Sequence, residues 1–358
     1  MKVLLYGEPL SPGCGSWSYA TTLQKLGHTV EHCDSWEGLE KYAESFLHRV
    51  YKRLSGGIAE RDRRRHVARL LEHAERYRPD LVIVLKGLHI AKADIEQMQR
   101  GGAFVVIINH DDFFSLNPSN VTRVQRAALP AWDYVFVCRE ANVGEVREFN
   151  PNVEFLWFGY NPEVHYPVPV DPTSEEDRVW RSDVAFVGTW EKERADLIEY
   201  LAERVDADFA IWGSQWEKLP SNSVLRKHLR GNEVYMDDQC RALGGAKISL
   251  GFLRKMNRDL FTTRTFEIPA CGGLLLGERT TLHEAIFREG VEAEYFDVND
   301  PDEMVAKVKA LLADDERRKR IRDAGMLALE QGKHRYQDRV EQVLARVQPR
   351  SQAEVEGV

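Results

Sequence analysis

Two carboxylates and an arginine stand close together in one short stretch of this sequence. Asp259 and Glu267 are eight positions apart, Arg264 lies between them, and a Gly-Gly pair follows. A guanidinium can grip a diphosphate, and a carboxylate can accept two hydrogen bonds from vicinal sugar hydroxyls. These residue types at this spacing predict a site for a nucleotide sugar.

The elements around this stretch are expected to place it at a ligand-binding edge. The stretch follows a predicted strand, Lys247–Phe252, and a polar loop leads into a short helix that contains Arg264, Thr265 and Glu267. In open α/β sheets, ligands bind outside the carboxyl ends of the strands, and helix N-termini favour anions. We therefore assign these three residues to donor binding. The alternative is an amphipathic core helix with an incidental Glu.

The run Arg264–Gly273, with the sequence RTFEIPACGG, resembles the donor-site signature of GT-B glycosyltransferases. It is most similar to the CgeB-like branch (spore-maturation protein-like) and more distantly similar to the retaining family 4 enzymes. In the latter, a Glu-x7-Glu motif holds the donor sugar and the ribose. Here the matching spacing is Asp259-x7-Glu267, with Asp in the first position. The resemblance implies that Glu267 binds ribose or sugar hydroxyls and that Asp259 lies near the sugar or diphosphate.

Composition limits the class of protein. A chain of 358 residues is expected to form two domains, and its hydrophobic content of 43% fits a globular protein. A net charge of −8 argues against a general nucleic-acid binder. No apolar run approaches the roughly 20 residues that span a bilayer, and the N-terminus does not resemble a signal peptide. The five scattered cysteines, without a Cys-x-x-Cys pair, predict a cytoplasmic protein and offer no metal site.

Strands alternate with helices along the first half, which predicts a parallel, doubly wound sheet. The predicted strands are Lys2–Gly7, His28–Asp34, Asp80–Gly87, Ala103–Asn109, Tyr134–Cys138 and Val153–Phe158. After the first strand, Gly13 and Gly15 would let the backbone approach a ligand, and Ser16 follows them. The resemblance implies that this loop faces the interdomain cleft on the acceptor side. A plain tight turn is the alternative.

Titratable groups follow the fourth predicted strand directly. His110, Asp111 and Asp112 stand at its carboxyl end. An Asp or His at such a position could take the proton from an acceptor hydroxyl, so these three are the candidate catalytic residues. A solvated turn with a helix cap is the alternative.

A basic segment at Arg61–Arg65 lies in a predicted helix of the first half. It could make a peripheral contact with anionic lipid or with a charged acceptor. The alternative is an ordinary solvated helix face, which nearby acidic residues such as Glu60 and Glu72 favour.

A proline-rich linker divides the chain. Gly159–Pro169 contains three prolines, and it resembles the hinge of GT-B enzymes. We predict an acceptor-side domain over residues 1–168 and a nucleotide-sugar donor domain over 169–333. Residues 334–358 would form a C-terminal helix, which could cross back to the first domain, and a tail.

The second half repeats the strand–loop–helix plan. Its predicted strands are Asp183–Gly188, Asp208–Gly213, Lys247–Phe252, Leu274–Leu276 and Ala293–Phe296, with Val234-Tyr235 as a candidate short strand. Glycines and cations in the loops suit a diphosphate. The further donor-binding candidates are Gly188, Thr189, Lys192, Arg194, Trp212, Gly213 and Arg254. The alternatives are helix-surface charges, packing tryptophans and a basic surface loop.

These observations predict two Rossmann-like domains facing each other across a cleft, and glycosyl transfer from a UDP-, GDP- or TDP-sugar to a hydroxyl of a glycan, glycolipid or protein-linked acceptor. The resemblance suggests polysaccharide biosynthesis. If configuration inverts, Asp111 with His110 or Asp112 is the base, and if it is retained the departing phosphate can accept the proton. No Asp-x-Asp motif is placed to hold a metal, so we predict no metal and no other cofactor. A sugar-nucleotide epimerase and a non-catalytic carbohydrate-binding or coat-assembly protein are the alternatives.

Overall fold

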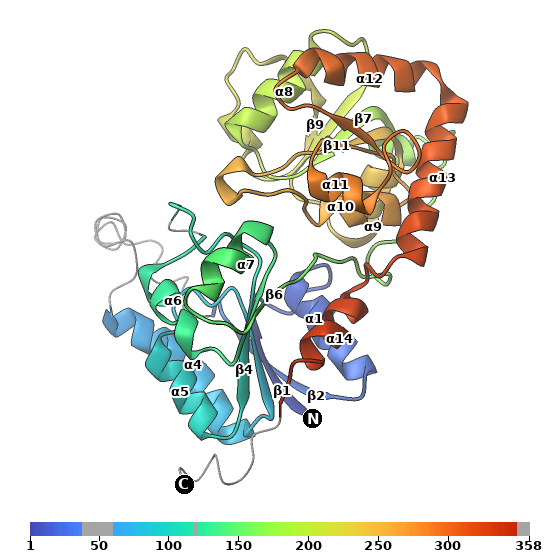
Figure 1. Ribbon diagram of the computed structural model, residues 1–358. Helices are drawn as coiled ribbons and strands as arrows, with labels where there is room; N and C mark the ends of the chain where they lie inside the picture. The colour runs from blue at the N-terminus through green and yellow to red at the C-terminus, as the bar shows by residue number, and fades with distance from the viewer. Residues whose placement is uncertain (38–59, 118–119, 349–358) are drawn as a thin grey trace. The chain divides into compact units, whose positions relative to one another are not determined.

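A computed structural model describes residues 1–37, 60–117 and 120–348, which form two compact units (Figure 1). Unit 1 consists of Met1–Trp157, Lys255–Asp259 and Tyr336–Val358, and unit 2 consists of Phe158–Arg254 and Leu260–Arg335. The division along the chain thus falls at 157/158 rather than at the 168 expected from the prolines. The last ten residues of unit 1 lie outside the described ranges.

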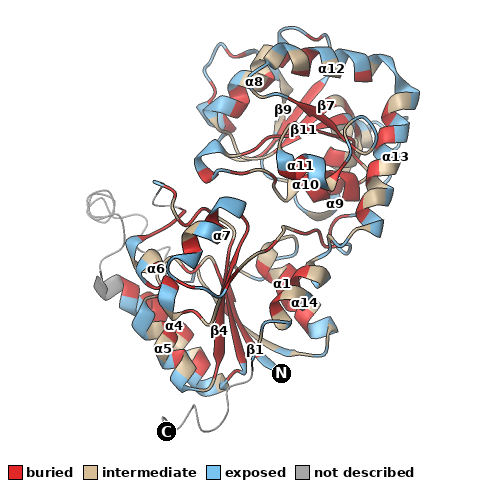
Figure 2. Ribbon diagram, viewed as in Figure 1, coloured by how far each residue is buried: buried red, intermediate tan, exposed pale blue. Residues whose placement is uncertain are grey.

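Unit 1 is built on a parallel sheet in the order β2-β1-β3-β4-β5-β6. Its strands are β1 Lys2–Gly7, β2 Thr29–Asp34, β3 Leu81–Leu85, β4 Phe104–Asn109, β5 Tyr134–Val137 and β6 Val153–Phe155. β3 and β4 are buried along their whole length, as Figure 2 shows, because helices cover both faces of a parallel sheet. The strand order reverses between β1 and β3, so a ligand-binding edge is expected beyond Gly7 and Leu85.

The helices of unit 1 pack on this sheet. They are α1 Gly15–Lys25, α4 Glu60–Tyr77, α5 Lys92–Arg100, α6 Arg123–Ala127, α7 Glu140–Arg147 and α14 Tyr336–Leu344, with short 3-10 turns at Leu129–Ala131 and Lys255–Asn257. The Tyr336 ring stands edge-on to Tyr19 of α1, with the ring centroids 5.2 Å apart. The last helix of the described chain therefore belongs to unit 1.

Unit 2 contains a second parallel sheet, in the order β12-β11-β10-β7-β8-β9. Its strands are β7 Ser182–Val187, β8 Phe209–Trp212, β9 Leu229–Gly231, β10 Ala246–Gly251, β11 Leu275–Glu278 and β12 Glu294–Phe296. The order reverses between β7 and β10. The predicted strand at Val234-Tyr235 was wrong, because the edge strand lies at Leu229–Gly231 instead. This segment has only a weak apolar signal, and its pairing with β8 defines it as a strand.

Helices complete unit 2 on both faces of this sheet. They are α8 Lys192–Ala202, α9 Met236–Gly244, α10 Arg264–Ala270, α11 Thr281–Ile286, α12 Pro301–Ala313 and α13 Asp315–Gln331, with 3-10 turns at Glu176–Trp180, Trp216–Lys218 and Val224–His228. Aspartate side chains cap two of them: Asp300 accepts from the Glu303 amide and Asp314 from the Arg317 amide.

The basic segment of α4 has a partly structural role. Side chains are described here from Arg63 onward, so Arg61 lies outside the description. Arg63 is buried, and its Nη1 lies 2.6 Å from Oδ2 of Asp94 and donates to the carbonyl of His89 at 3.0 Å. Arg64 and Arg65 are exposed. Among the described helices, none combines the length and apolar character that crossing a bilayer needs.

Replacing Arg63 by Ala is expected to lower the free energy of unfolding by about 2 kcal/mol, because it removes the charged partner of the half-buried Asp94 and leaves that carboxylate with the Ala91 amide as its described partner. Arg65→Ala on the exposed face of the same helix is the matched control and should change it by less than about 0.5 kcal/mol. Urea unfolding followed by circular dichroism measures both. Equal losses for the two variants would show that Arg63 is an ordinary surface cation.

Candidate functional site

Charged side chains converge at the carboxyl ends of β7 and β10 in unit 2. From α10, the Nε of Arg264 donates to the carbonyl of Val187 at 3.1 Å. Arg254, which follows β10, donates from Nε to Glu191 Oε1 at 2.7 Å, and Arg194 Nε lies 3.6 Å from Glu191 Oε2. The structure thus brings three of the predicted donor-site cations to the point where the strand order of unit 2 reverses, where a ligand is expected.

Two loops that begin with glycine follow β7 and β8 at this edge of the sheet. The Gly188 amide donates to the Trp212 carbonyl at 2.9 Å, and Trp216 Nε1 donates to the Gly188 carbonyl at 2.9 Å. Thr189 Oγ1 and Ser214 Oγ are hydrogen-bonded at 3.2 Å. Gly213 has a φ of 143°, and a Cβ there would lie 2.0 Å from the Gly188 oxygen. Only glycine at position 213 lets the two loops approach so closely.

Glu267 is the buried carboxylate of this site, with 8% of its surface exposed. Its Oε2 is ion-paired with Nη1 of Arg264 and lies 3.4 Å from Nε2 of Gln239, and its Oε1 lies 3.6 Å from Nε2 of His165. Burial would raise the pKa of Glu267, but Arg264 and His165 outweigh it and the pKa lies below its usual value. Glu267 is therefore an ionised acceptor at neutral pH.

Sequence reasoning missed His165 and Gln239. His165 was part of a stretch interpreted only as a hinge, and Gln239 was part of an unassigned helix. A buried histidine beside the carboxylate of Glu267 would have indicated a role for His165. The sequence does not show this proximity, because the two residues are about a hundred positions apart.

Thr265 connects α10 to α11 through a hydrogen bond with His283. The residue is buried, and its Oγ1 lies 2.9 Å from Nε2 of His283, whose Nδ1 donates to the Glu278 carbonyl at 2.6 Å. Burial lowers the pKa of His283 to about 4, so its Nε2 is unprotonated at neutral pH and accepts from the Thr265 hydroxyl. The geometry favours a positioning role for Thr265 over direct contact with a donor.

Two other donor candidates fit their structural alternatives. The Lys192 side chain is 76% exposed and pairs with Asp196 one helical turn away, at 2.6 Å. Trp212 is buried and stacks on Trp180, with the ring centroids 5.9 Å apart. Lys192 thus lies on the exposed surface of α8 and Trp212 packs inside unit 2, and donor binding by either residue stays a prediction.

The predicted acceptor-side loop lies at the carboxyl end of β1 in unit 1. Gly13 has a φ of 95°, which favours glycine. Oε1 of Glu8 accepts from the amide of Gly15 at 2.7 Å and from that of Ser16 at 3.4 Å. The carboxylate of Glu8 therefore occupies the start of α1, where an anion would otherwise bind.

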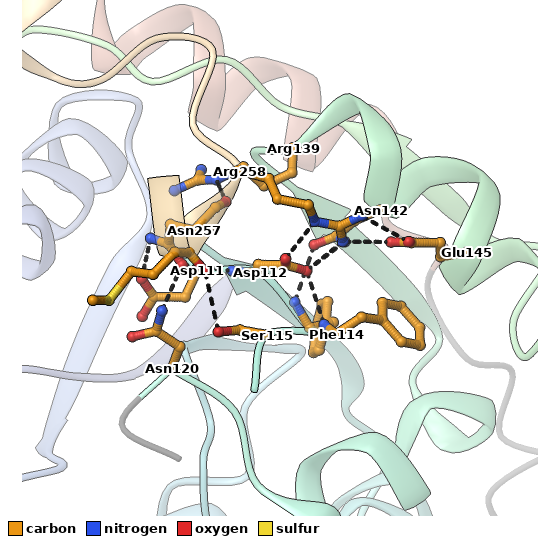
Figure 3. Close-up of polar contacts among 12 residues, drawn as sticks. Asp111, Asp112, Phe114, Ser115, Asn120, Arg139, Asn142, Glu145, Asn257 and Arg258 are labelled. Atoms are coloured by element: carbon orange, nitrogen blue, oxygen red, sulfur yellow. Dashed lines mark hydrogen bonds and ion pairs between the residues drawn. The ribbon is translucent and has the colours of Figure 1, made fainter. Parts of the chain in front are cut away.

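His110, Asp111 and Asp112 follow β4, as expected, but their environments differ. Figure 3 shows Asp112 surrounded by donors: Arg258 contacts both of its oxygens at 2.6 and 2.7 Å, and Asn142 and the Phe114 amide add bonds of 2.9 and 2.8 Å. These donors outweigh burial and hold the pKa of Asp112 below its usual value. This arrangement favours a structural role for Asp112.

Asp111 and His110 have different environments from that of Asp112. Asp111 pairs with Lys86 Nζ at 2.6 Å and accepts from Asn257 Nδ2 at 2.9 Å. Burial would raise the pKa of Asp111, but Lys86 and Asn257 outweigh it and leave the pKa lowered. His110 stacks on Tyr19 at 6.3 Å, and burial lowers its pKa, so the imidazole is neutral at neutral pH. Asp111 is thus a weak base, and His110 can accept a proton.

The segment Lys255–Asp259 belongs to unit 1, although it lies in the sequence between β10 and α10 of unit 2. Asn257 Oδ1 accepts from the Asp112 amide at 3.2 Å and from Asn120 Nδ2 at 2.7 Å (Figure 3). Asp259 forms a buried ion pair with Arg139. Asp259 therefore belongs to unit 1, whereas Glu267 belongs to unit 2.

A cavity of about 640 Å³ in unit 2 lies away from these groups. It is lined by the linker around Pro167 and by residues that begin β7 and β10, such as Ser182 and Lys247. None of the predicted site residues lines it, and we place the candidate site at the opposite strand ends, where the charged groups converge. Within residues 1–37, 60–117 and 120–348, no group of three His, Cys, Asp or Glu side chains is placed to hold a metal.

Comparisons with known proteins agree with the two-sheet architecture. Residues 192–345 match a family described as "Glycosyl transferase-like". No curated protein matches the sequence. Similar solved structures include Anabaena HepE in complex with UDP and glucose, with a TM-score of 0.65, 11% identity, and 96% of this chain and 98% of that one covered. Sucrose-phosphate synthase from Thermosynechococcus elongatus has a TM-score of 0.68 at 13% identity, with 96% and 97% covered. The predicted α/β fold with two Rossmann-like sheets is confirmed.

Gly213→Ala is expected to destabilise unit 2 by about 2 kcal/mol or more. The new Cβ would overlap the Gly188 carbonyl, and alanine would have to adopt a φ angle that is strained for it. Gly231→Ala on the neighbouring strand is the control, since its Cβ would meet only Trp212 at an ordinary 3.7 Å. Chemical unfolding of both variants measures the difference. Similar stabilities would mean that the two loops are not in close contact.

Proposed function

We propose that this chain, a nucleotide-sugar-dependent glycosyltransferase of the GT-B kind, moves a sugar from a UDP-sugar to a hydroxyl acceptor. The choice of uridine is supported by the similar structures, because Anabaena HepE was solved with UDP-glucose and an E. coli protein described as trehalose-6-phosphate was solved with UDP-2-fluoro glucose. The latter has a TM-score of 0.64 at 10% identity, with 100% and 99% covered.

The observation that carries this proposal is the convergence of Arg194, Arg254 and Arg264 around the Gly188 loop, beside the ionised Glu267. A diphosphate at the carboxyl end of β7 would find guanidinium groups that match its geometry. As the glycosidic bond to phosphate breaks, negative charge grows on the leaving diphosphate, and fixed cations stabilise that charge more than the ground state. Glu267 would accept hydrogen bonds from ribose or sugar hydroxyls.

On the acceptor side, His110 and Asp111 are the proposed base candidates for an inverting reaction. Neutral His110 can accept a proton directly, whereas Asp111 is held as a weak base by Lys86. If configuration is retained, the departing phosphate can take the acceptor proton and neither residue need act as a base. The roles of Asp112 and Asp259 in this proposal are structural, because Arg258 and Arg139 engage their carboxylates.

The finer assignments rest on the sequence. We place the chain in the CgeB-like branch on the run Arg264–Gly273, and we propose a cytoplasmic role in polysaccharide biosynthesis, with a glycan, glycolipid or protein-linked hydroxyl as the acceptor. The exposed Arg64 and Arg65 of α4 are the described side chains that could contact an anionic membrane surface.

UDP-glucose at millimolar concentration is expected to raise the melting temperature, because a ligand of the native state stabilises it by mass action. Arg264→Ala should weaken UDP binding by about 10-fold or more, the effect of losing a hydrogen bond to a charged group. Calorimetric titration measures the affinity, and Arg288→Ala, which removes an exposed arginine of unit 2, is the control. If no nucleotide sugar binds at millimolar concentration, the proposal fails.

Sugar transfer is expected to continue unchanged in excess EDTA, because arginines rather than a metal would neutralise the diphosphate. Product formation with and without chelator measures this. Loss of activity that magnesium or manganese restores would refute metal independence. Consumption of the donor without any acceptor would favour an epimerase, and binding without turnover would favour a carbohydrate-binding protein.

A further inference from the structure

His165, in the linker that precedes β7, faces the carboxylate of Glu267. Both residues are almost completely buried, with exposures of 5% and 8%. Nε2 of His165 lies 3.6 Å from Oε1 of Glu267, whereas Arg264 and Gln239 contact Oε2. The two carboxylate oxygens thus have different partners, which come from different segments of unit 2.

The linker fixes which ring nitrogen of His165 carries the proton. The backbone amide of Asn161 donates to Nδ1 of His165 at 3.2 Å, so Nδ1 is the acceptor and Nε2 carries the hydrogen. Burial outweighs Glu267 and lowers the pKa of His165, so the ring is neutral at neutral pH. Nε2 lies 3.6 Å from Oε1, which is longer than a hydrogen bond, so the neutral imidazole contacts the carboxylate without neutralising it.

The turn that holds the imidazole is itself rigid. The amides of Val164 and His165 both donate to the carbonyl of Asn161, at 2.9 and 2.8 Å, and the Glu163 amide donates to the side-chain oxygen of Asn161 at 3.0 Å. Pro162 restricts φ within the same turn. The position of the ring is therefore set by the backbone of the linker rather than by a flexible side chain.

We propose that His165 is a positioning residue for donor binding: it fixes the orientation of the Glu267 carboxylate, so that the free lone pairs of that carboxylate meet two vicinal hydroxyls of the nucleotide sugar. The inference rests on the proposed function, since it gives Glu267 a donor hydroxyl to hold. It also makes the linker part of the donor site, in addition to its role as a connection. A carboxylate held on one side only could rotate and would lose this two-point geometry.

A double-mutant cycle tests the proposal. His165→Phe keeps a ring of similar size and removes the N–H, and it should weaken UDP-glucose binding by about 10-fold. In the Glu267→Gln background the same change should have almost no effect, because His165 acts through the carboxylate. His165→Gln, which retains an N–H donor, should stay within about threefold of the parent protein. His228→Phe, at a half-buried histidine of unit 2, is the matched control.

The outcomes distinguish a positioning role of His165 from a general loss of structure in the variant. An equal loss of affinity for His165→Phe in the Glu267 and Glu267→Gln backgrounds would overturn the proposal, since the histidine would then act independently of the carboxylate. So would unchanged binding in His165→Phe. Titrations with UDP and with UDP-glucose, compared side by side, show whether the hydroxyls held are on the ribose or on the transferred sugar.

A measurement without ligand keeps the test independent of the proposed function. If the parent protein binds no nucleotide sugar, the proposed function fails while the contact with Glu267 can still be measured. Carbon-13 NMR of glutamate-labelled protein, with the Glu267 signal identified by its loss in Glu267→Gln, reports the pKa of that carboxyl. The pKa should rise in His165→Phe and not in His228→Phe. An unchanged pKa would show that His165 does not hold the carboxylate.

Discussion

The cost of burying an ionised carboxylate is the constraint that organises the candidate donor site. Glu267 is buried in unit 2, and its ion pair with Arg264 helps to keep its pKa low in spite of that burial, while Gln239 and His165 lie close to its oxygens. These partners come from α10, α9 and the linker, so compensation of one charge ties three segments together. The same carboxylate that could hold a sugar hydroxyl thus also fixes the local packing of unit 2.

Unit 1 follows the same rule at the end of β4. Asp112 is satisfied chiefly by Arg258, and Asp259 is paired with Arg139, so that buried charges account for the docking of the Lys255–Asp259 segment. Asn257 adds neutral hydrogen bonds to Asp111 and to the backbone of Asp112. Because a buried charge without its partner is costly, these contacts hold the Lys255–Asp259 segment in one position on unit 1.

The close approach of two backbone segments also shapes the candidate donor site. The contact of Gly213 with the Gly188 carbonyl brings the ends of β7 and β8 together, and Trp216 bonds to the same carbonyl from the adjoining turn. The loops are therefore held by backbone geometry, while the arginines around them supply charge.

The sequence by itself determined the strands, because runs such as Leu81–Leu85 are apolar along their whole length, and it determined the short helix with Arg264 and Glu267. It could not assign the partners of charged groups. The eight-residue spacing of Asp259 and Glu267 suggested one site, whereas the tertiary structure assigns Asp259 to unit 1 and Glu267 to unit 2. The edge strand Leu229–Gly231 has only a weak apolar signal, and its pairing with β8 defines it. Only the tertiary structure decided that His165 faces Glu267, because the partner of a buried charge is chosen by proximity in space, which local sequence patterns do not encode.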